Sequence, residues 1–302
     1  MADSSQIQSG NRSPTVSVGL PVHNGGRFLA QALDSILGQS LQDIEVIISD
    51  NASTDDSAAI CRAYSSRDPR IRYIHQVKNL GAARNWNFVA EQAQGKYFKW
   101  SSANDFCAKT MLEKCVAAME ADPSIVLCHG KTCLVEEETN AQMEYDRDIA
   151  LTDASPIERF KTLCLKLALN NAQNGIIRHD ALKRTRLEGL YPHGDLALMA
   201  ELALQGKFVL LPEILFYRRM GPESFSSLLT SDQLQEFIDP HSKLRPGFNR
   251  LRLHLDYFSM MGSARIGLRE KLRGLTFVVH NAFWDKALIW AELRNGMRRR
   301  AD

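Results

Sequence analysis

The sequence predicts an α/β protein in which a mostly parallel sheet is flanked by helices and followed by a C-terminal helical extension. Three observations predict this class. Four short apolar runs alternate with three helical patterns over residues 16–100, and a polar loop follows each run. Apolar residues then recur every three or four positions over residues 265–300, as they do on one face of a helix. Strands that alternate with helices are joined by right-handed crossovers, so their sheet is mostly parallel and covered on both faces.

Length and composition restrict the class of protein. The chain has 302 residues, of which 44% are hydrophobic and 24% charged, as in a globular protein with room for one large domain or two smaller ones. Its net charge of +2 gives no reason to expect a nucleic-acid partner. The six cysteines form no CxxC pair, and a chain of this length needs no disulfide framework. We therefore expect reduced thiols and a cytoplasmic protein.

Two segments bear on targeting. Residues 1–14 are polar and lack the apolar stretch of a signal peptide, so we expect a disordered lead-in. Residues 275–293 are the most apolar part of the C-terminal segment, but His280, Asn281 and Asp285 interrupt them. Polar and charged residues at that density are not expected in a bilayer span. The sequence therefore predicts neither export nor a transmembrane helix.

The elements of the first half follow in a regular order. Strands are predicted where apolar runs are rich in β-branched or aromatic residues, at 16–20, 44–48, 71–74 and 97–100. The first of them stops at Pro21, where a turn containing Asn and Gly begins. Helices are predicted from apolar periodicity at 28–37, 58–64 and 83–93.

The second half is predicted in less detail. A helix is expected at residues 111–119 and a strand at 125–129. Residues 134–156 are polar and acidic, so we expect an exposed insertion without a chemical role. Asp195 opens an amphipathic helix, and a carboxylate at that position caps free N–H groups and complements the helix dipole.

Polar loops after the predicted strands form the candidate functional site. Residue types suited to a nucleotide occur at 24–26, 50–51, 79–84 and 101–105. In a parallel sheet these loops meet at the carboxyl edge, where ligands bind. The same residue types also serve as ordinary caps and turn formers, which is the alternative. Neither a GxGxxG after the first strand nor a GxxxxGK[ST] occurs, so another mode of nucleotide binding is needed.

The order of the motifs resembles glycosyltransferase family 2, whose domain has the Rossmann-like GT-A fold. The motifs are SVGLPVHNGGRFLAQALDSILGQS at 17–40, VIISDNASTDDS at 46–57 and NLGAARNWNFVAEQAQGKYFKWSSAND at 79–105. The resemblance implies a domain at 15–225, with a donor half at 15–130 and an acceptor half at 131–225, and leaves 226–302 as a helical, basic extension. It implies inverting transfer of a sugar from a nucleotide-sugar donor, with UDP-sugars favoured, to an acceptor hydroxyl. The process implied is polysaccharide, glycolipid or cell-surface glycan synthesis, on a saccharide or lipid-linked acceptor.

The resemblance also implies which residues bind the donor. Contacts to the base and ribose fall to Pro21, His23, Asn24, Asp50 and Asn51. Asp50 suits this role because a carboxylate accepts hydrogen bonds from an imide N–H or a ribose diol. The other donor-binding residues are Ser102 and Ala103, together with Arg84, Arg218 and Arg219, which would face the diphosphate as fixed cations.

The loop at 102–105 departs from the family pattern. Relatives carry Asp-x-Asp-Asp here, and these acids hold a divalent ion, Mn²⁺ or Mg²⁺, that bridges the two phosphates. This chain has Ser102-Ala103-Asn104-Asp105, which leaves Asn104 and Asp105 as the metal ligands. A His that relatives often carry after the basic pair is replaced by Gly221. Three alternatives follow: weak metal binding through these two residues, catalysis without metal in which Arg and Lys cover the diphosphate, or loss of activity.

Asp195 matches the general base of the family, which takes the proton of the attacking hydroxyl. A base on the acceptor side needs no covalent glycosyl-enzyme, and inversion follows from the resemblance. Two competing hypotheses are a catalytically silent nucleotide-sugar-binding relative that acts as a scaffold, and a nucleotidyltransferase on a similar domain. The second is disfavoured, because LPVHNGGRF differs from the Gly-rich, Lys/Arg-bearing loop that nucleotidyltransferases carry after the first strand.

The C-terminal segment is basic. Residues 262–300 contain nine Lys or Arg against three acidic residues, a net charge of +6. Their apolar positions fall on one helical stripe formed by Leu268, Leu272, Leu275, Val279, Phe283, Ala287 and Trp290. One interpretation is a helix, or a helix pair, packed on the catalytic domain with a solvated outer face. The other is an interfacial helix at the inner face of an anionic membrane, with the headgroup level occupied by Phe277, Phe283, Trp284 and Trp290.

Overall fold

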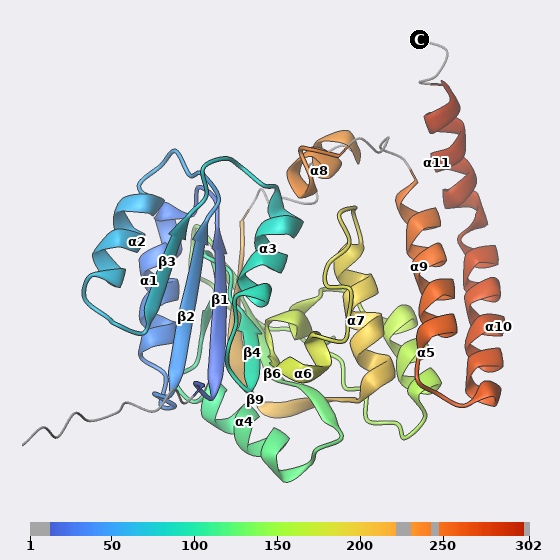
Figure 1. Ribbon diagram of the computed structural model, residues 1–302, viewed down its shortest axis with the longest axis horizontal. Helices are drawn as coiled ribbons and strands as arrows, with labels where there is room; N and C mark the ends of the chain where they lie inside the picture. The colour runs from blue at the N-terminus through green and yellow to red at the C-terminus, as the bar shows by residue number, and fades with distance from the viewer. Residues whose placement is uncertain (1–12, 222–230, 243–247, 299–302) are drawn as a thin grey trace, which may run out of the picture.

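The computed structural model describes residues 13–221, 231–242 and 248–298. Within these residues the predicted α/β class is confirmed, since a mixed sheet of nine strands is flanked by helices and further helices follow at the C-terminal end (Figure 1). The strand order is β3-β2-β1-β4-β8-β6-β9-β5, and β7 pairs with β6 outside this path. The expected lead-in at 1–14 lies outside the described residues except for positions 13 and 14.

The first four strands are parallel, as predicted. They are β1 (Val16–Val22), β2 (Ile44–Asp50), β3 (Ile71–His75) and β4 (Tyr97–Trp100). The crossovers between them are α1 (Gly26–Leu37), α2 (Ser57–Ser65) and α3 (Ala82–Glu91). All four strands therefore end at the same edge of the sheet, and the loops after them meet there.

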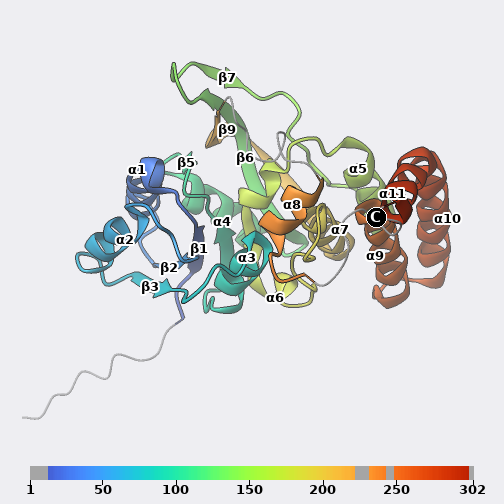
Figure 2. The same cartoon turned by 90° about the horizontal axis from the view of Figure 1, so that it is seen from above.

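Alternating side chains of these strands enter two separate cores. On β2, Val46 and Ile48 join the core under α1, whereas Ile47 joins the core under α3. Every residue of β1 and β4 is buried, as expected for strands that are covered on both faces. Figure 2 shows α1 and α2 on one side of this part of the sheet and α3 on the other.

The first strand runs two residues further than predicted. Pro21 lies inside β1 and is paired with Ser49 of β2. A proline has no N–H to give to a neighbouring strand. The pairing of β1 with β4 ends at Gly19 and Trp100. No residue of β4 is therefore paired with Pro21, and the missing N–H costs no hydrogen bond between these strands. The extension carries the start of the first loop closer to the carboxyl edge.

The second half completes the sheet. Its two long strands, β6 (Ile125–Glu136) and β9 (Lys207–Met220), are parallel neighbours. Shorter antiparallel pairings are made by β5 (Phe106–Cys107), β7 (Gln142–Glu144) and β8 (Ile176–Arg178). The helices are α4 (Met111–Ala121), α5 (Pro156–Lys166), α6 (His179–Leu182) and α7 (Gly194–Gln205), with a 3-10 turn at Asn171–Asn174.

Residues 134–156 are mostly exposed, as expected, but they include regular structure and core side chains that were not predicted. β6 continues to Glu136 and turns back into β7, so the start of this stretch is a β-hairpin. Further along, Ile149 and Leu151 are buried in the core under α3 and α7. The hairpin was not predicted because the acidic residues sit at its bend, where polar residues are common whatever the flanking structure.

Four helices make up the C-terminal part in the ranges that the structure describes: α8 (Ser231–Ile238), α9 (Asn249–Ser263), α10 (Leu268–Trp284) and α11 (Lys286–Arg298). The helix or helix pair expected over 265–300 is therefore a pair, α10 and α11. α9 packs on α7, and α10 packs on α5 and α9, at the end of the molecule away from β3 (Figure 1). None of the described helices has the length and apolar character needed to span a bilayer. The domain boundaries stay predictions.

Candidate functional site

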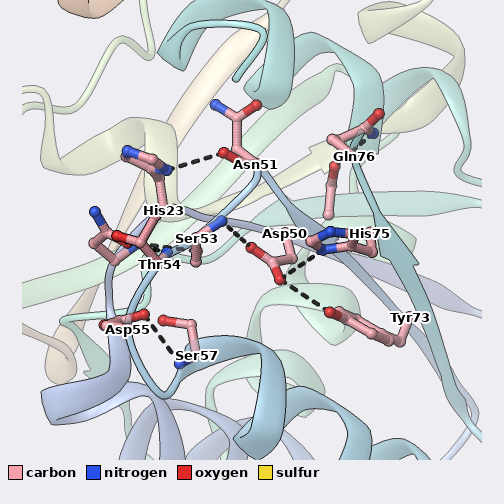
Figure 3. Close-up of polar contacts among 12 residues, drawn as sticks. His23, Asp50, Asn51, Ser53, Thr54, Asp55, Ser57, Tyr73, His75 and Gln76 are labelled. Atoms are coloured by element: carbon pink, nitrogen blue, oxygen red, sulfur yellow. Dashed lines mark hydrogen bonds and ion pairs between the residues drawn. The ribbon is translucent and has the colours of Figure 1, made fainter. Parts of the chain in front are cut away.

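Hydrogen bonds join the loops that follow β1 and β2. Asn24 Oδ1 accepts the Thr54 N–H at 2.8 Å, and the Gly26 N–H donates to Asp55 Oδ2 at 2.9 Å. Figure 3 shows Thr54 and Asp55 on the loop after β2, with His23 beside them. Gly26 is the first residue of α1, so Asp55 satisfies an N–H that has no partner within the helix. The segment after β2 thus fixes the loop after β1.

The loop after β3 joins the same network through Asn51. Asn51 Nδ2 donates to Asn79 Oδ1 at 2.8 Å, and the Leu80 N–H donates to Asn51 Oδ1 at 2.7 Å. On the other side, His23 Nδ1 lies 2.9 Å from Asn51 O (Figure 3). Three of the predicted loops are therefore held together by Asn51, whose side chain is buried.

The Asp50 carboxylate is buried and accepts hydrogen bonds from within the protein. Oδ1 accepts the Ser53 N–H at 2.9 Å, while Oδ2 accepts the Tyr73 hydroxyl at 2.9 Å and lies 3.1 Å from His75 Nδ1 (Figure 3). Burial raises the pKa of Asp50, but the hydrogen bonds outweigh burial and lower the pKa below its usual value. Asp50 is thus a charged anchor for its loop, and its contact with a nucleotide stays a prediction.

A cavity of about 800 Å³ begins at Asn24 and extends into the second half of the chain. Its walls come from the start of α1, the 102–105 loop, the residue after β6, the segment before β8, the start of α7 and the end of β9. The predicted site residues that line it are Asn24, Ser102, Asn104, Asp105, Asp195, Arg218 and Arg219. Gly221, the position where relatives carry His, lines it as well. Residues from both predicted halves therefore meet in one cavity.

The other predicted site residues do not line this cavity: Pro21, His23, Asp50, Asn51, Arg84 and Ala103. Ala103 is buried, and a Cβ added to Gly25 would come within 2.7 Å of the Ala103 methyl group. Arg84 donates from Nε and Nη2 to the two carboxylate oxygens of Asp239, each at 3.3 Å. Asp239 is buried just beyond α8, so this ion pair connects α3 to the end of α8. The donor-binding roles of these residues stay predictions.

Arg219 brings an unsatisfied guanidinium to the cavity. Its backbone N–H donates to Asp105 Oδ1 at 2.9 Å, and its Nη2 donates to Gln31. The guanidinium carbon lies 4.2 Å from the centre of the Phe28 ring, which supports it from one side. Nε and Nη1 are buried and have no hydrogen-bond partner among the described residues. Because unpaired buried donors are costly, this arrangement suits an anion that arrives with the ligand.

Further cations surround Asp105. Burial raises the pKa of Asp105, and Arg218, Arg219 and Lys99 oppose that rise. Lys99 is buried on β4, where Nζ donates to Trp100 O at 2.8 Å and to the backbone oxygen of Asn174 at 2.7 Å. Burial lowers the pKa of Lys99, which does not line the cavity, so the positive charge beside Asp105 comes mainly from Arg218 and Arg219.

The residues at 104 and 105 determine whether a divalent ion fits. In the parts of the chain that the structure describes, no group of three or more His, Cys, Asp or Glu side chains is placed to hold a metal. Asp105 is half-buried, and Asn104 is exposed at the edge of the cavity. Mg²⁺ and similar ions are commonly held by one or two carboxylates, with substrate phosphates and water as the remaining ligands. One carboxylate from Asp105 and one amide oxygen from Asn104 fit such an ion, for which phosphates and water would supply most of the ligands.

Asp195 is the second residue of α7 and is linked to a second carboxyl group through two amides. Its Oδ2 accepts Asn170 Nδ2 at 2.9 Å, and the same Nδ2 donates to Gln173 Oε1 at 2.9 Å. Gln173 Nε2 in turn donates to Glu188 Oε1. This chain of hydrogen bonds fixes the side chains on the α7 side of the cavity.

Gly194 determines where α7 begins. A Cβ at this position would lie 2.1 Å from Gly189 O, so the approach of the two segments requires glycine. The preceding residue, His193, has a φ of 78°, and the Gly194 N–H donates to Tyr191 O at 2.9 Å. The tight turn places Asp195 in the lining of the cavity.

Several cavity residues were missed by the sequence analysis: Arg27, Phe28, Trp86, Glu137, Asn170, Gln173, Asn174 and His193. Glu137 lay within the supposed insertion, yet it forms an ion pair with Arg27 of α1. The amide-rich run NNAQN at 170–174 was a usable signal, because a run of Asn and Gln beside a buried strand needs polar partners. The pairing of Glu137 with Arg27 depends on the fold and had no signal in the sequence.

A sheet whose first four strands are parallel, with polar loops joined at their carboxyl edge and a cavity shared by two halves of the chain, defines the GT-A class of α/β proteins. Residues 17–185, more than half of the chain, match the family described as Glycosyl transferase family 2. The chain belongs to that family, as the motifs predicted.

Similar proteins agree with this assignment. The chain is 34% identical over 116 residues to glycosyltransferase GlyG of Streptococcus pneumoniae serotype 4, a match that covers 38% of each protein. It is 29% identical over 168 residues to the putative teichuronic acid biosynthesis glycosyltransferase TuaG of Bacillus subtilis, covering 56% of this chain and 67% of TuaG. The chain thus spans well under two thirds of the length of GlyG.

A solved structure confirms the fold. The crystal structure of S. aureus TarS 1–349 in complex with UDP-GlcNAc matches with a TM-score of 0.65 and 14% sequence identity. The match covers 94% of this chain and 81% of the TarS fragment.

Proposed function

We propose that this protein transfers a sugar from a nucleotide-sugar donor, with a UDP-sugar favoured, to an acceptor hydroxyl. One observation carries the proposal: a single cavity is lined both by Arg219, two of whose guanidinium nitrogens have no partner among the described residues, and by Asp195. A fixed cation suits a leaving diphosphate, and a carboxylate suits the proton of an attacking hydroxyl. Membership of glycosyl transferase family 2 supports the same reaction class.

The two arginines at the end of β9 bind the diphosphate. Arg219 Nε and Nη1 donate to phosphate oxygens, and Arg218, held by Asn171 Oδ1 at 2.9 Å, adds a second guanidinium. Negative charge grows on the diphosphate as its bond to the anomeric carbon breaks, and preorganised cations stabilise that charge. Asn24 and the loops joined to it bind the nucleoside part of the donor.

Asp195 acts as general base on the acceptor. The acceptor oxygen forms a bond to the anomeric carbon as the bond from that carbon to the diphosphate breaks, and Asp195 takes the hydroxyl proton. Attack from the face opposite the leaving group inverts the configuration at the anomeric carbon. The Asn170 hydrogen bond to Asp195 Oδ2 holds the carboxylate in one orientation during this step.

Asp105 and Asn104 would hold a divalent ion, Mn²⁺ or Mg²⁺, and such an ion would supply positive charge at the diphosphate. Arg218 and Arg219 supply fixed positive charge around the same point.

The transfer serves the synthesis of a polysaccharide, glycolipid or cell-surface glycan, with a saccharide or lipid-linked acceptor. The name of TuaG, which refers to teichuronic acid biosynthesis, supports a bacterial cell-surface polymer as the product class.

Nucleotide release from a panel of UDP-sugars and GDP-sugars tests the proposal. The panel is run with Mn²⁺, with Mg²⁺ and with EDTA, alone and with saccharide acceptors, and thermal unfolding is recorded for each donor. We expect release from at least one UDP-sugar, increased by an acceptor. A donor that raises the unfolding temperature but releases no nucleotide under any condition contradicts the proposal. That result assigns the protein instead to a catalytically silent nucleotide-sugar-binding scaffold.

A further inference from the structure

α10 exposes a stripe of large apolar side chains. The stripe consists of Leu268, Leu272, Val279 and Phe283, which are 73%, 56%, 53% and 59% exposed. At about 100° of rotation per helical residue, these four positions fall within a sector of roughly 60°. Exposed side chains of this size in one row are unusual for a surface that contacts only water.

The opposite side of α10 packs on the rest of the protein. Gly274, Phe277 and Val278 are buried, and the Phe277 ring meets Phe160 of α5 edge-on at 5.8 Å between ring centres. A Cβ at Gly274 would lie 2.3 Å from the Met261 sulfur of α9, so α10 lies very close to α9. The expectation that Phe277 reaches lipid headgroups is therefore wrong, because its ring fills the core. The exposed stripe of α10 consists instead of Leu268, Leu272, Val279 and Phe283.

Other exposed apolar side chains near the end of α10 do not belong to this stripe. Trp284, Leu288 and Trp290 are 64%, 48% and 60% exposed. At about 100° of rotation per residue, Trp284 lies about 100° beyond Phe283, and Leu288 and Trp290 point to different sides of α11. We call the stripe of Leu268, Leu272, Val279 and Phe283 the outer face.

The charges around the outer face are mainly positive. Arg265, Arg269 and Arg294 are exposed and form no salt bridge among the described residues. Lys286 Nζ lies 3.8 Å from the centre of the Phe283 ring, so a cation stands next to the stripe.

The acidic residues of α10 and α11 are held within the protein. Glu270 pairs with Arg273 at 2.8 Å, and Asp285 pairs with Arg250 at 3.0 Å. Glu292 accepts the backbone N–H of Arg250 at 3.1 Å. The negative charges of these helices are thus compensated, and the cations beside the outer face remain to attract anions.

We infer that the outer face docks on a lipid bilayer that contains anionic lipids. The apolar side chains enter the boundary between headgroups and acyl chains, while the flanking arginines contact lipid phosphates. A second copy of the chain fits this surface less well. A two-fold contact would place the cations of one copy near the same cations of the other, without acids to compensate them.

Vesicle flotation of the full chain tests the inference without a donor or an acceptor. The vesicles are phosphatidylcholine alone and phosphatidylcholine mixed with phosphatidylglycerol. We expect the protein to float with the mixed vesicles and to stay in solution with phosphatidylcholine alone. High salt should reduce flotation, because it screens the attraction between arginine and phosphate.

Two variants separate the apolar and the electrostatic contributions. Leu272→Glu combined with Phe283→Glu should weaken vesicle binding by at least roughly tenfold, since two buried apolar contacts are lost. Arg269→Gln should weaken binding to the mixed vesicles by about fivefold. The matched control is Val77→Glu, which makes the same kind of change at a side chain that is 98% exposed on a loop after β3, and should bind as the unchanged chain does.

Circular dichroism and analytical ultracentrifugation complete the experiment. All variants change exposed side chains, and we expect them to keep the helical signal of the unchanged chain. Absence of flotation with the mixed vesicles overturns the inference, as does equal flotation of the Leu272→Glu/Phe283→Glu variant. A dimer that dissociates in that variant, without flotation of the unchanged chain, assigns the outer face to a second copy.

Discussion

Asn170 Nδ2 donates one hydrogen bond to Asp195 Oδ2 and a second to Gln173 Oε1, each 2.9 Å long. Both partners accept, so a flipped Asn170 amide would lose both hydrogen bonds. The orientation of Asn170 is therefore fixed by its neighbours, and Asn170 in turn fixes the Asp195 carboxylate.

Replacing Asn170 by Ala should lower kcat by about tenfold and leave donor affinity unchanged. The Asp195 carboxylate loses the hydrogen bond that holds it in one orientation, so it meets the acceptor hydroxyl less often in a productive geometry. Nucleotide release with acceptor measures kcat, and calorimetric titration measures donor affinity. An unchanged kcat would show that Asn170 does not position Asp195, and rescue by Asn170→Gln would support the positioning role.

Asp195→Asn should abolish transfer and spare donor binding. The amide cannot take a proton from the acceptor, and we expect a loss of about a hundredfold or more. Asn remains a good residue at a helix start, so α7 should stay folded. Calorimetric titration with the donor and turnover with an acceptor measure the two effects separately. Retained turnover would remove Asp195 from the mechanism.

Glu188 should make the protein less stable as pH rises. Burial raises the pKa of Glu188 to about 8, with Asp195 adding to the rise and the Gln173 hydrogen bond opposing it. An unfolded Glu ionises near pH 4.5, so between pH 4.5 and 8 the folded chain binds the extra proton. The free energy of unfolding therefore falls through this window, by at most about 1.4 kcal/mol per pH unit from this group.

Glu188→Gln removes this contribution. The variant should match or exceed the unchanged chain in stability at pH 8 and lose that advantage near pH 5. Urea unfolding at both pH values measures the difference, with Glu138→Gln at an exposed position as the control. Parallel pH dependence of the unchanged chain and the Glu188 variant would contradict the prediction.

Arg219→Ala should weaken binding of a UDP-sugar by roughly ten- to a hundredfold, because charge-assisted hydrogen bonds to the diphosphate are lost. Arg84→Ala is the matched comparison, since Arg84 pairs with Asp239 outside the cavity. If Arg84 faced the diphosphate as the family resemblance implies, the two variants would weaken donor binding equally. The cavity geometry predicts a change of only a few fold for Arg84→Ala. Calorimetric titration with the donor distinguishes the two.

Asp105→Asn should raise the Mn²⁺ concentration needed for half-maximal nucleotide release by about tenfold or more, because it removes the one carboxylate of the 102–105 loop. Release in EDTA should change little by comparison. Equal Mn²⁺ dependence of the unchanged chain and the variant would show that Asp105 does not bind the metal.

The parallel half of the fold could be predicted because its signals are local. Each run from 16–20 to 97–100 is apolar and short, and the loops that follow must share one edge once the strands are parallel. The antiparallel strands could not be predicted in the same way. The pairing of β6 with β7 depends on contacts between strands, and the acidic bend between them resembles any exposed loop.

In the candidate site, too, residues within local motifs could be predicted, and residues that depend on contacts between distant segments could not. Asp105, Asp195 and Arg219 were found through the family motifs, and they do line one cavity. Asn170 and Glu188 were not found, because their importance comes from hydrogen bonds that bridge separate segments. Asp50 is the opposite case. It lies in a recognisable motif, but its carboxylate contacts Ser53, Tyr73 and His75 within the protein.

The hydrogen bonds among the loops at the carboxyl edge have a thermodynamic consequence. Asn24, Asn51 and Asp55 hold three loops together through hydrogen bonds within the protein, so a nucleotide does not have to order them. The entropy lost on binding is then mainly that of the ligand itself. Nucleoside recognition should therefore be rapid docking to a preformed surface, at a rate limited by encounter and not by loop closure.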